Sequence, residues 1–285
     1  MNIYIEYRWL DKAAITEGTP SISNQEDQKN RGRLCTVEQV TDVKRLLTLI
    51  PLWTTFIAYG VVKATGNTFF IKQSSNMDVH IGKVKVPLMS FFVFKFCICF
   101  ITQWLLHWMF KVARRQNVQL VGIGVGMVCT VLCCITAWRV EVHRLNLIEK
   151  EGIDPRDPNQ IISMSVLWLL PQFALLGLME GFANTGLEKF MRNHVSKSMK
   201  SCGKLLKDCV IGFGNFFSIP CVLLFKSWFK DTINTSHLDR YYLALAILGF
   251  MFLCLYVCVL STYARMEALL EDEESYEGFE DDFYS

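Results

Sequence analysis

A single carboxylate interrupts an apolar stretch that is long enough to span a membrane. Residues 167–186, LWLLPQFALLGLMEGFANTG, contain Glu180 as their only charged side chain. An ionised group in a low-dielectric medium is costly unless a partner or water compensates it, and such groups often mark substrate or ion pathways. We therefore expect Glu180 to face the interior of a helix bundle.

Two stripes of polar residues run along otherwise apolar segments. Residues four or eight positions apart lie on the same face of a helix. The stripes are formed by Gln172, Glu180 and Asn184 in one segment, and by Thr55, Tyr59, Lys63 and Asn67 in another. Two such stripes indicate a shared polar interior. A second interpretation remains open for Lys63, because 46–62 is only 17 residues long and the ammonium could reach the interface from the end of a short helix.

Other patterns that could do chemistry are weak. Most of the 11 cysteines fall within apolar segments and show no CxxC spacing, and none of the five histidines has HExxH or similar spacing. The glycines of VGIGVG lack the strand and the spacing of a nucleotide-binding loop, and Gly122 and Gly126 suit close helix packing better. We expect no metal site, no cofactor and no enzymatic activity.

The composition and its blocks indicate a polytopic membrane protein. Hydrophobic residues make up 52% of the 285 residues and charged residues only 20%. A helix needs ~20 residues to cross the ~30 Å hydrocarbon core. Six apolar blocks approach or exceed that length, at 46–71, 86–110, 118–138, 161–185, about 209–225 and 241–263. We predict six transmembrane helices.

The charges suggest the domain organisation and the orientation in the membrane. Residues 1–45 are polar and are predicted to be a cytoplasmic linker, 46–263 a six-helix bundle, and 264–285 an acidic, disordered cytoplasmic tail. Lys and Arg number 17 on the side of the two termini and 10 on the opposite side. The positive-inside rule therefore predicts that both termini are cytoplasmic.

Several motifs together resemble one transporter family. MSVLWLLPQFALLGLMEGFANTGLEKFM resembles the tenth span of the proton-dependent oligopeptide transporter family, in its plant nitrate/peptide branch. YRWLDKAAI is similar to the end of that family's central loop, and RLCTVEQVTDVKRLLTLIPLWTT to the entry into its seventh span. SWFKDTINTSHLDRYYLALAIL resembles the approach to the twelfth span. The order of the motifs corresponds to spans seven to twelve.

The resemblance implies a fold and several roles. It implies an all-α membrane protein whose six helices form the second bundle of a major-facilitator fold, which works by alternating access and proton symport. Glu180 matches the tenth-span glutamate that faces the cavity, Lys63 stands where nitrate-carrying members have a histidine, and Trp168 matches a tryptophan near the cavity. We assign Glu180, Lys63, Trp168, Tyr59, Gln172 and Asn184 to a substrate and proton cavity.

Two functional hypotheses follow. The first is the carboxy-terminal half of a proton-coupled transporter of nitrate, peptide or another small solute, inactive alone because the first six spans are missing, as in a fragment. The second is a non-transporting membrane protein that associates with full-length transporters. The expected partners are protons, a small solute, the bilayer of the plasma or vacuolar membrane and a separate amino-terminal bundle, with no nucleic acid.

Overall fold

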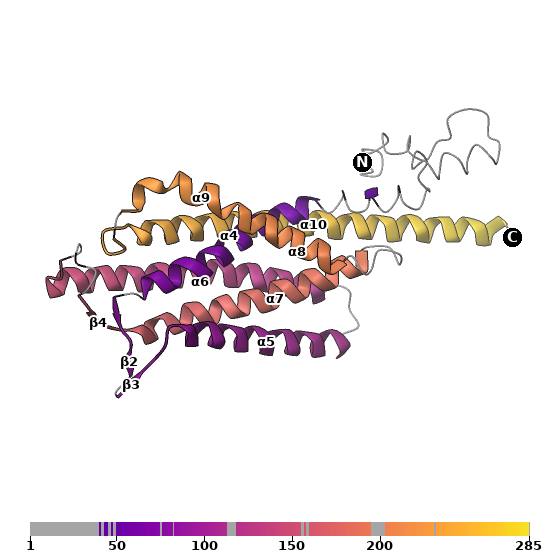
Figure 1. Ribbon diagram of the computed structural model, residues 1–285. Helices are drawn as coiled ribbons and strands as arrows, with labels where there is room; N and C mark the ends of the chain where they lie inside the picture. Colours follow the sequence, from indigo (N-terminus) through magenta and orange to yellow (C-terminus); the bar gives the residue numbers. More distant parts are fainter. Residues whose placement is uncertain are drawn as a thin grey trace, which may run out of the picture.

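The protein is seen here as a computed structural model, in which long helices run side by side and short strands gather at one end (Figure 1). It describes residues 50–74, 76–81, 83–112, 118–154, 157, 160–194, 203–230 and 232–284, together with Val40, Val43, Lys44 and Leu47, and side chains are described no further than Thr262. The predicted linker 1–45 lies almost wholly outside these residues.

One helix, α7, forms the centre of the bundle. It packs against α5, α6 and α8, while α10 packs against α6 and α4, and α4 packs against α8. The α-helices in the described part of the chain are α4 (Ile50–Gln73), α5 (Met89–Val112), α6 (Val118–Glu151), α7 (Leu170–His194), α8 (Gly203–Phe216), α9 (Ser218–Leu224) and α10 (Leu238–Tyr284). The core includes Phe70, Phe173 and Tyr242, whose rings meet edge to face across α4, α7 and α10. This mainly helical architecture agrees with the predicted all-α class.

Short strands connect the helices at the end of the bundle opposite the carboxyl end of α10 (Figure 1). β1 (Met77–Asp78) pairs in parallel with β4 (Ile162–Ser165), and β2 (His80–Ile81) pairs antiparallel with β3 (Val84–Lys85). The β1–β4 pair joins the connection between α4 and α5 to the one between α6 and α7. The 3₁₀ helices η2 (Val166–Leu169) and η4 (Lys226–Trp228) complete the structure at this end.

Five segments of the described chain are long and apolar enough to cross a membrane: Met89–Lys111, Val118–Glu151, Val166–Asn193, Gly203–Leu224 and Leu238–Thr262. They correspond to five of the six predicted spans. The sixth segment, α4, is a helix of 24 residues but is not in this set. It contains the polar stripe described above, so its membrane crossing stays a prediction.

A proline lies close to each of two helix boundaries. The predicted span 161–185 is wrong at its start, because 162–165 is a strand and α7 begins only at Leu170. Pro171 is the second residue of α7, where its missing N–H breaks no helix hydrogen bond, and Leu170 before it is already helical, with a φ of −54° and a ψ of −46°. Pro220 lies in α9 just after the break at Phe217, so α8 and α9 together form one interrupted span.

The helix α6 is longer than the predicted span 118–138. It continues to Glu151 and ends at Gly152, which has a φ of +65°. The N–H groups of Gly152 and Ile153 bond back to the carbonyls of Glu149 and Ile148, as in a Schellman motif. At the other end of the chain, the backbone of α10 is helical to Tyr284 and so includes most of the segment 264–285 for which we predict disorder. The boundaries of bundle and tail stay predictions.

Candidate functional site

Glu180 of α7 and Lys95 of α5 form a buried ion pair inside the bundle. The Lys95 Nζ donates a hydrogen bond to the Glu180 Oε1 at 3.1 Å, and their side chains are 3% and 7% exposed. Gly177 and Gly181 flank Glu180 and allow α5 to approach this closely. A Cβ on Gly177 would lie 2.6 Å from the backbone oxygen of Lys95, and one on Gly181 would lie 2.6 Å from the Thr102 Cβ. The two glycines therefore explain why these charges can meet.

Lys63 of α4 approaches the same carboxylate from a third helix. Its Nζ lies 4.0 Å from the Glu180 Oε2, and its side chain is 20% exposed. Asn67, one turn further along α4, accepts a hydrogen bond of 2.9 Å from the Lys95 Nζ. The structure thus brings Lys63 and Glu180 together, and the ammonium of Lys63 points into the bundle at this position.

Tyr59 and Asn184 extend this cluster by one helical turn. The Tyr59 hydroxyl donates to the Asn184 Oδ1 at 3.4 Å, and Tyr59 is fully buried. Four of the six residues assigned from the sequence therefore lie along one strip between α4 and α7. We call Tyr59, Lys63, Lys95, Glu180 and Asn184 the charge cluster.

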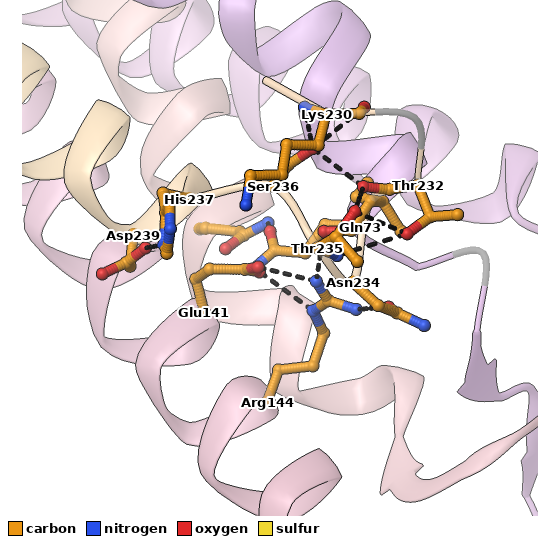
Figure 2. Close-up of polar contacts among 12 residues, drawn as sticks. Gln73, Glu141, Arg144, Lys230, Thr232, Asn234, Thr235, Ser236, His237 and Asp239 are labelled. Atoms are coloured by element: carbon orange, nitrogen blue, oxygen red, sulfur yellow. Dashed lines mark hydrogen bonds and ion pairs between the residues drawn. The ribbon is translucent and has the colours of Figure 1, made fainter. Parts of the chain in front are cut away.

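Gln172 belongs to a different network, nearer the strands. Its Nε2 donates to the Gln73 Oε1 at 3.1 Å, and the Gln73 Nε2 donates to the Glu141 Oε2 at 2.8 Å. Arg144 donates to both oxygens of Glu141, at 2.7 and 3.0 Å, and to the Asn234 Oδ1 at 2.6 Å (Figure 2). Glu141 and Arg144 are completely buried. This network ties α4, α6 and α7 to the segment before α10.

Trp168 lies away from the charge cluster. It is in η2, is 51% exposed, and its ring contacts His143 of α6 with centroids 4.7 Å apart. Glu180 is twelve residues further along the chain, so the two side chains are several turns apart. The structure does not bring Trp168 or Gln172 to Glu180.

Sequence reasoning missed Lys95 as a site residue. The signal was present, because Lys95 is a lone cation in the apolar block 86–110. The side chain also lies over the Phe96 ring, with Nζ 4.5 Å from its centroid. Glu141 and Arg144 were missed too, because the predicted span ended at residue 138, before their segment. Their spacing of three residues, which suits an ion pair on one helix, could have revealed them.

The charge cluster holds two ammonium groups around one carboxylate. With all three ionised, its net charge is +1, in a part of the bundle where solvent screening is weak. Such a site can attract an anionic group. Among the described residues, no group of three or more His, Cys, Asp or Glu side chains is placed to hold a metal ion.

These features define an all-α, multi-pass membrane protein with paired charges buried between its helices. The family model described as the POT family matches residues 2–237. The chain belongs to the POT family, whose members are solute transporters.

Relatives from Arabidopsis thaliana resemble this chain over part of their length. The chain is 31% identical to Protein NRT1/PTR FAMILY 5.5 over 270 residues, which are 90% of this chain and 50% of that protein. It is 31% identical to Protein NRT1/PTR FAMILY 5.4 over 95% of this chain and 51% of the relative. Protein NRT1/PTR FAMILY 8.1 is 30% identical over 92% and 48%. The chain thus spans about half the length of the curated relatives it matches.

Proposed function

We propose that this chain is the carboxy-terminal half of a proton-coupled transporter of a small solute, and that it works only with an amino-terminal six-helix bundle. The observation that carries the proposal is the buried cluster of Glu180, Lys95 and Lys63 between three helices. Family membership and the half-length match to the relatives support it. Both termini are proposed to be cytoplasmic, in the plasma or vacuolar membrane.

The two lysines suggest how protonation of Glu180 would be coupled to movement. While Glu180 is ionised, Lys95 holds α5 against α7, and Lys63 attracts α4 toward the same carboxylate. Protonation of Glu180 would remove both attractions and leave two ammonium groups, one buried and one partly exposed, that repel each other. The helices are then favoured to separate unless an anionic group of the solute replaces the carboxylate. Proton and solute would thus act on the same helix contacts.

The net charge of the charge cluster favours a solute with an anionic group. Nitrate, or the carboxylate of a peptide or other small organic solute, meets that requirement. Lys63 is the better contact for the solute, because its side chain is partly exposed and lies further from Glu180 than Lys95 does. Lys95 is the better structural anchor.

Uptake measurements with a joined transporter test this proposal. The amino-terminal half of a family relative is fused to this chain, and uptake of nitrate and of a dipeptide is measured against pH in a transport-deficient host. We expect proton-dependent uptake from the fusion and none from the chain alone. Glu180→Gln is expected to abolish the pH dependence, and Lys63→Met to lower the uptake of anions.

The matched control is Lys85→Met, which removes an exposed cation on β3 outside the charge cluster. Its uptake is expected to equal that of the unmodified fusion. Robust proton-dependent uptake by the purified 285-residue chain in liposomes would refute the need for a second bundle. Unchanged transport and pH profile in Glu180→Gln would remove the functional role of the charge cluster.

A further inference from the structure

A cavity of about 550 Å³ lies between α5, α7 and α8. It begins at Asn184, one turn of α7 beyond Glu180, and continues toward the end of the bundle that is remote from the strands. The wall formed by α5 is mainly aromatic, with Phe100, Trp104 and Phe110, and also contains Gln103 and His107. The opposite wall is formed by the last turns of α7 and the first turns of α8.

That opposite wall is strongly cationic. Four cationic side chains, Lys189, Arg192, Lys204 and Lys207, line the cavity together with one carboxylate, Glu188. Lys207 is the most buried of the four and pairs with Glu188 at 3.5 Å and with Asp208 at 3.3 Å.

The remaining cations of the wall form no ion pair with another residue that the structure describes. Lys189 lies over the Phe110 ring, with its Nζ 5.9 Å from the centroid. Within the described part of the chain, neither Arg192 nor Lys204 has an acidic partner. Among the residues that the structure describes, positive charge therefore exceeds negative charge around the cavity.

The aromatic residues of α5 indicate the depth of the cavity in the membrane. Trp104 and Trp108 are 63% and 59% exposed, and α5 ends a few residues later with Lys111 in its last turn. Tryptophan and lysine concentrate where helices leave the hydrocarbon for the headgroup region. The cavity therefore opens at the level where lipid phosphates lie.

We propose that this cavity binds a phosphate group, carried by an anionic lipid of the adjoining leaflet or free in solution. Arg192 offers a planar set of donors that suits phosphate oxygens, and Lys204 and Lys189 add compact charges. Phe100 and Trp104 provide an apolar surface for the part of a lipid next to its phosphate. The cavity shares Asn184 with the charge cluster, but its cationic residues lie beyond that cluster, and phosphate binding by them does not depend on the proposed transport activity.

Ligand titrations of the purified full chain in neutral detergent test the proposal. The probes are dihexanoyl phosphatidic acid, dihexanoyl phosphatidylcholine, in which choline offsets the phosphate charge, and inorganic phosphate. We expect phosphatidic acid or inorganic phosphate to bind and to raise the melting temperature, and phosphatidylcholine to bind weakly. The combined variant Arg192→Gln, Lys204→Gln should weaken binding by about tenfold or more, because hydrogen bonds to charged groups are lost.

Two further variants separate binding from folding and general charge. Arg192→Lys with Lys204→Arg keeps both charges and is expected to retain most of the affinity. Lys85→Gln with Lys226→Gln removes two exposed lysines at the other end of the bundle and is expected to leave binding unchanged.

A comparison of phosphatidic acid with inorganic phosphate also distinguishes the source of the phosphate. Binding of phosphatidic acid alone assigns the site to a lipid, and equal binding of inorganic phosphate assigns it to a soluble ligand. Equal affinities of the unmodified chain and the Arg192→Gln, Lys204→Gln variant for both probes would overturn the proposal. An equal loss of affinity in the lysine control would overturn it as well.

Discussion

Lys95 and Glu180 lie on different helices and 85 positions apart, yet their charged atoms meet at 3.1 Å in the interior of the bundle. Both side chains are almost completely buried, so each depends on the other for compensation of its charge. Breaking a buried pair by removing one partner leaves an uncompensated charge, which costs far more than the pair contributes when intact.

Removing Lys95 should therefore destabilise the protein more than removing Lys63. We expect Lys95→Met to lower the free energy of unfolding by about 3–5 kcal/mol, as for other broken buried pairs. Lys63→Met should cost less, because Lys63 is partly exposed and 4.0 Å from the carboxylate. Thermal or denaturant unfolding in detergent measures which variant loses more free energy of unfolding, with Lys85→Met as the exposed control. Equal losses in all three variants would contradict it.

The pair of Glu141 and Arg144 should be equally sensitive. Among the described residues, Arg144→Met leaves the Gln73 amide as the one remaining donor to Glu141, so we expect a loss of about 3–5 kcal/mol. The double variant Glu141→Met, Arg144→Met should cost less than the two single losses added together. Arg139→Met, at an exposed position on the same helix, is the control. Additive losses in the double-mutant cycle would mean that the two charges act independently.

Gly60 and Gly214 set the distance between α4 and α8. A Cβ on Gly60 would lie 2.4 Å from the backbone carbon of Gly214, so Gly60→Ala must push the helices apart. We expect a loss of about 1–3 kcal/mol or more from overpacking. Gly212→Ala on α8 is the matched control, since nothing lies within 4 Å of its added Cβ. A melting temperature of Gly60→Ala that matches the control would rule out this close contact.

The helix ends also predict a membrane topology. The carboxyl end of α6, which Gly152 directly follows, lies at the end of the bundle with the strands, and the carboxyl end of α10 lies at the other (Figure 1). An epitope tag inserted after Gly152 and a tag at the carboxyl end should therefore react with antibodies on opposite sides of the membrane. Sealed cells and permeabilised cells provide the comparison. Labelling of both tags on one side would exclude this topology.

The sequence was sufficient to locate most spans and four of the five residues of the charge cluster. Apolar blocks of spanning length identify helices because the bilayer imposes a minimum length. The two polar stripes were expected to share one interior, and the structure brings Lys63 of one stripe to Glu180 of the other, and Tyr59 to Asn184. Gly126 also packs closely as predicted, since a Cβ there would lie 2.9 Å from the Ala183 nitrogen, whereas one on Gly122 meets nothing within 4 Å.

The remaining differences between the prediction and the structure arise from distance along the helix axis and from tertiary packing. Gln172 shares a face with Glu180 but is eight residues away, about 12 Å along the axis, so it joins the other network. Lys95 could be recognised as an unusual charge, but its partner depends on how α5 packs on α7. The charged residues of 139–151 led us to end the predicted span at residue 138. In the structure this segment is helical, and its charges include the buried pair of Glu141 and Arg144.

The length of α6 has a mechanical consequence. Its 34 residues measure about 51 Å, whereas the hydrocarbon core is only ~30 Å thick. Roughly 20 Å of this rigid rod therefore extends beyond the hydrocarbon core. Ser163 of β4 hydrogen-bonds the Glu151 carboxylate at the end of this rod, which links it to the strand that leads into α7. A tilt of α6 by about 10° would move that end by roughly 3 Å. Movement of the outer end of α6 is thus transmitted along the helix into the bilayer. A protein that binds this end and holds it in place would fix the angle between α6 and α7 from outside the bilayer.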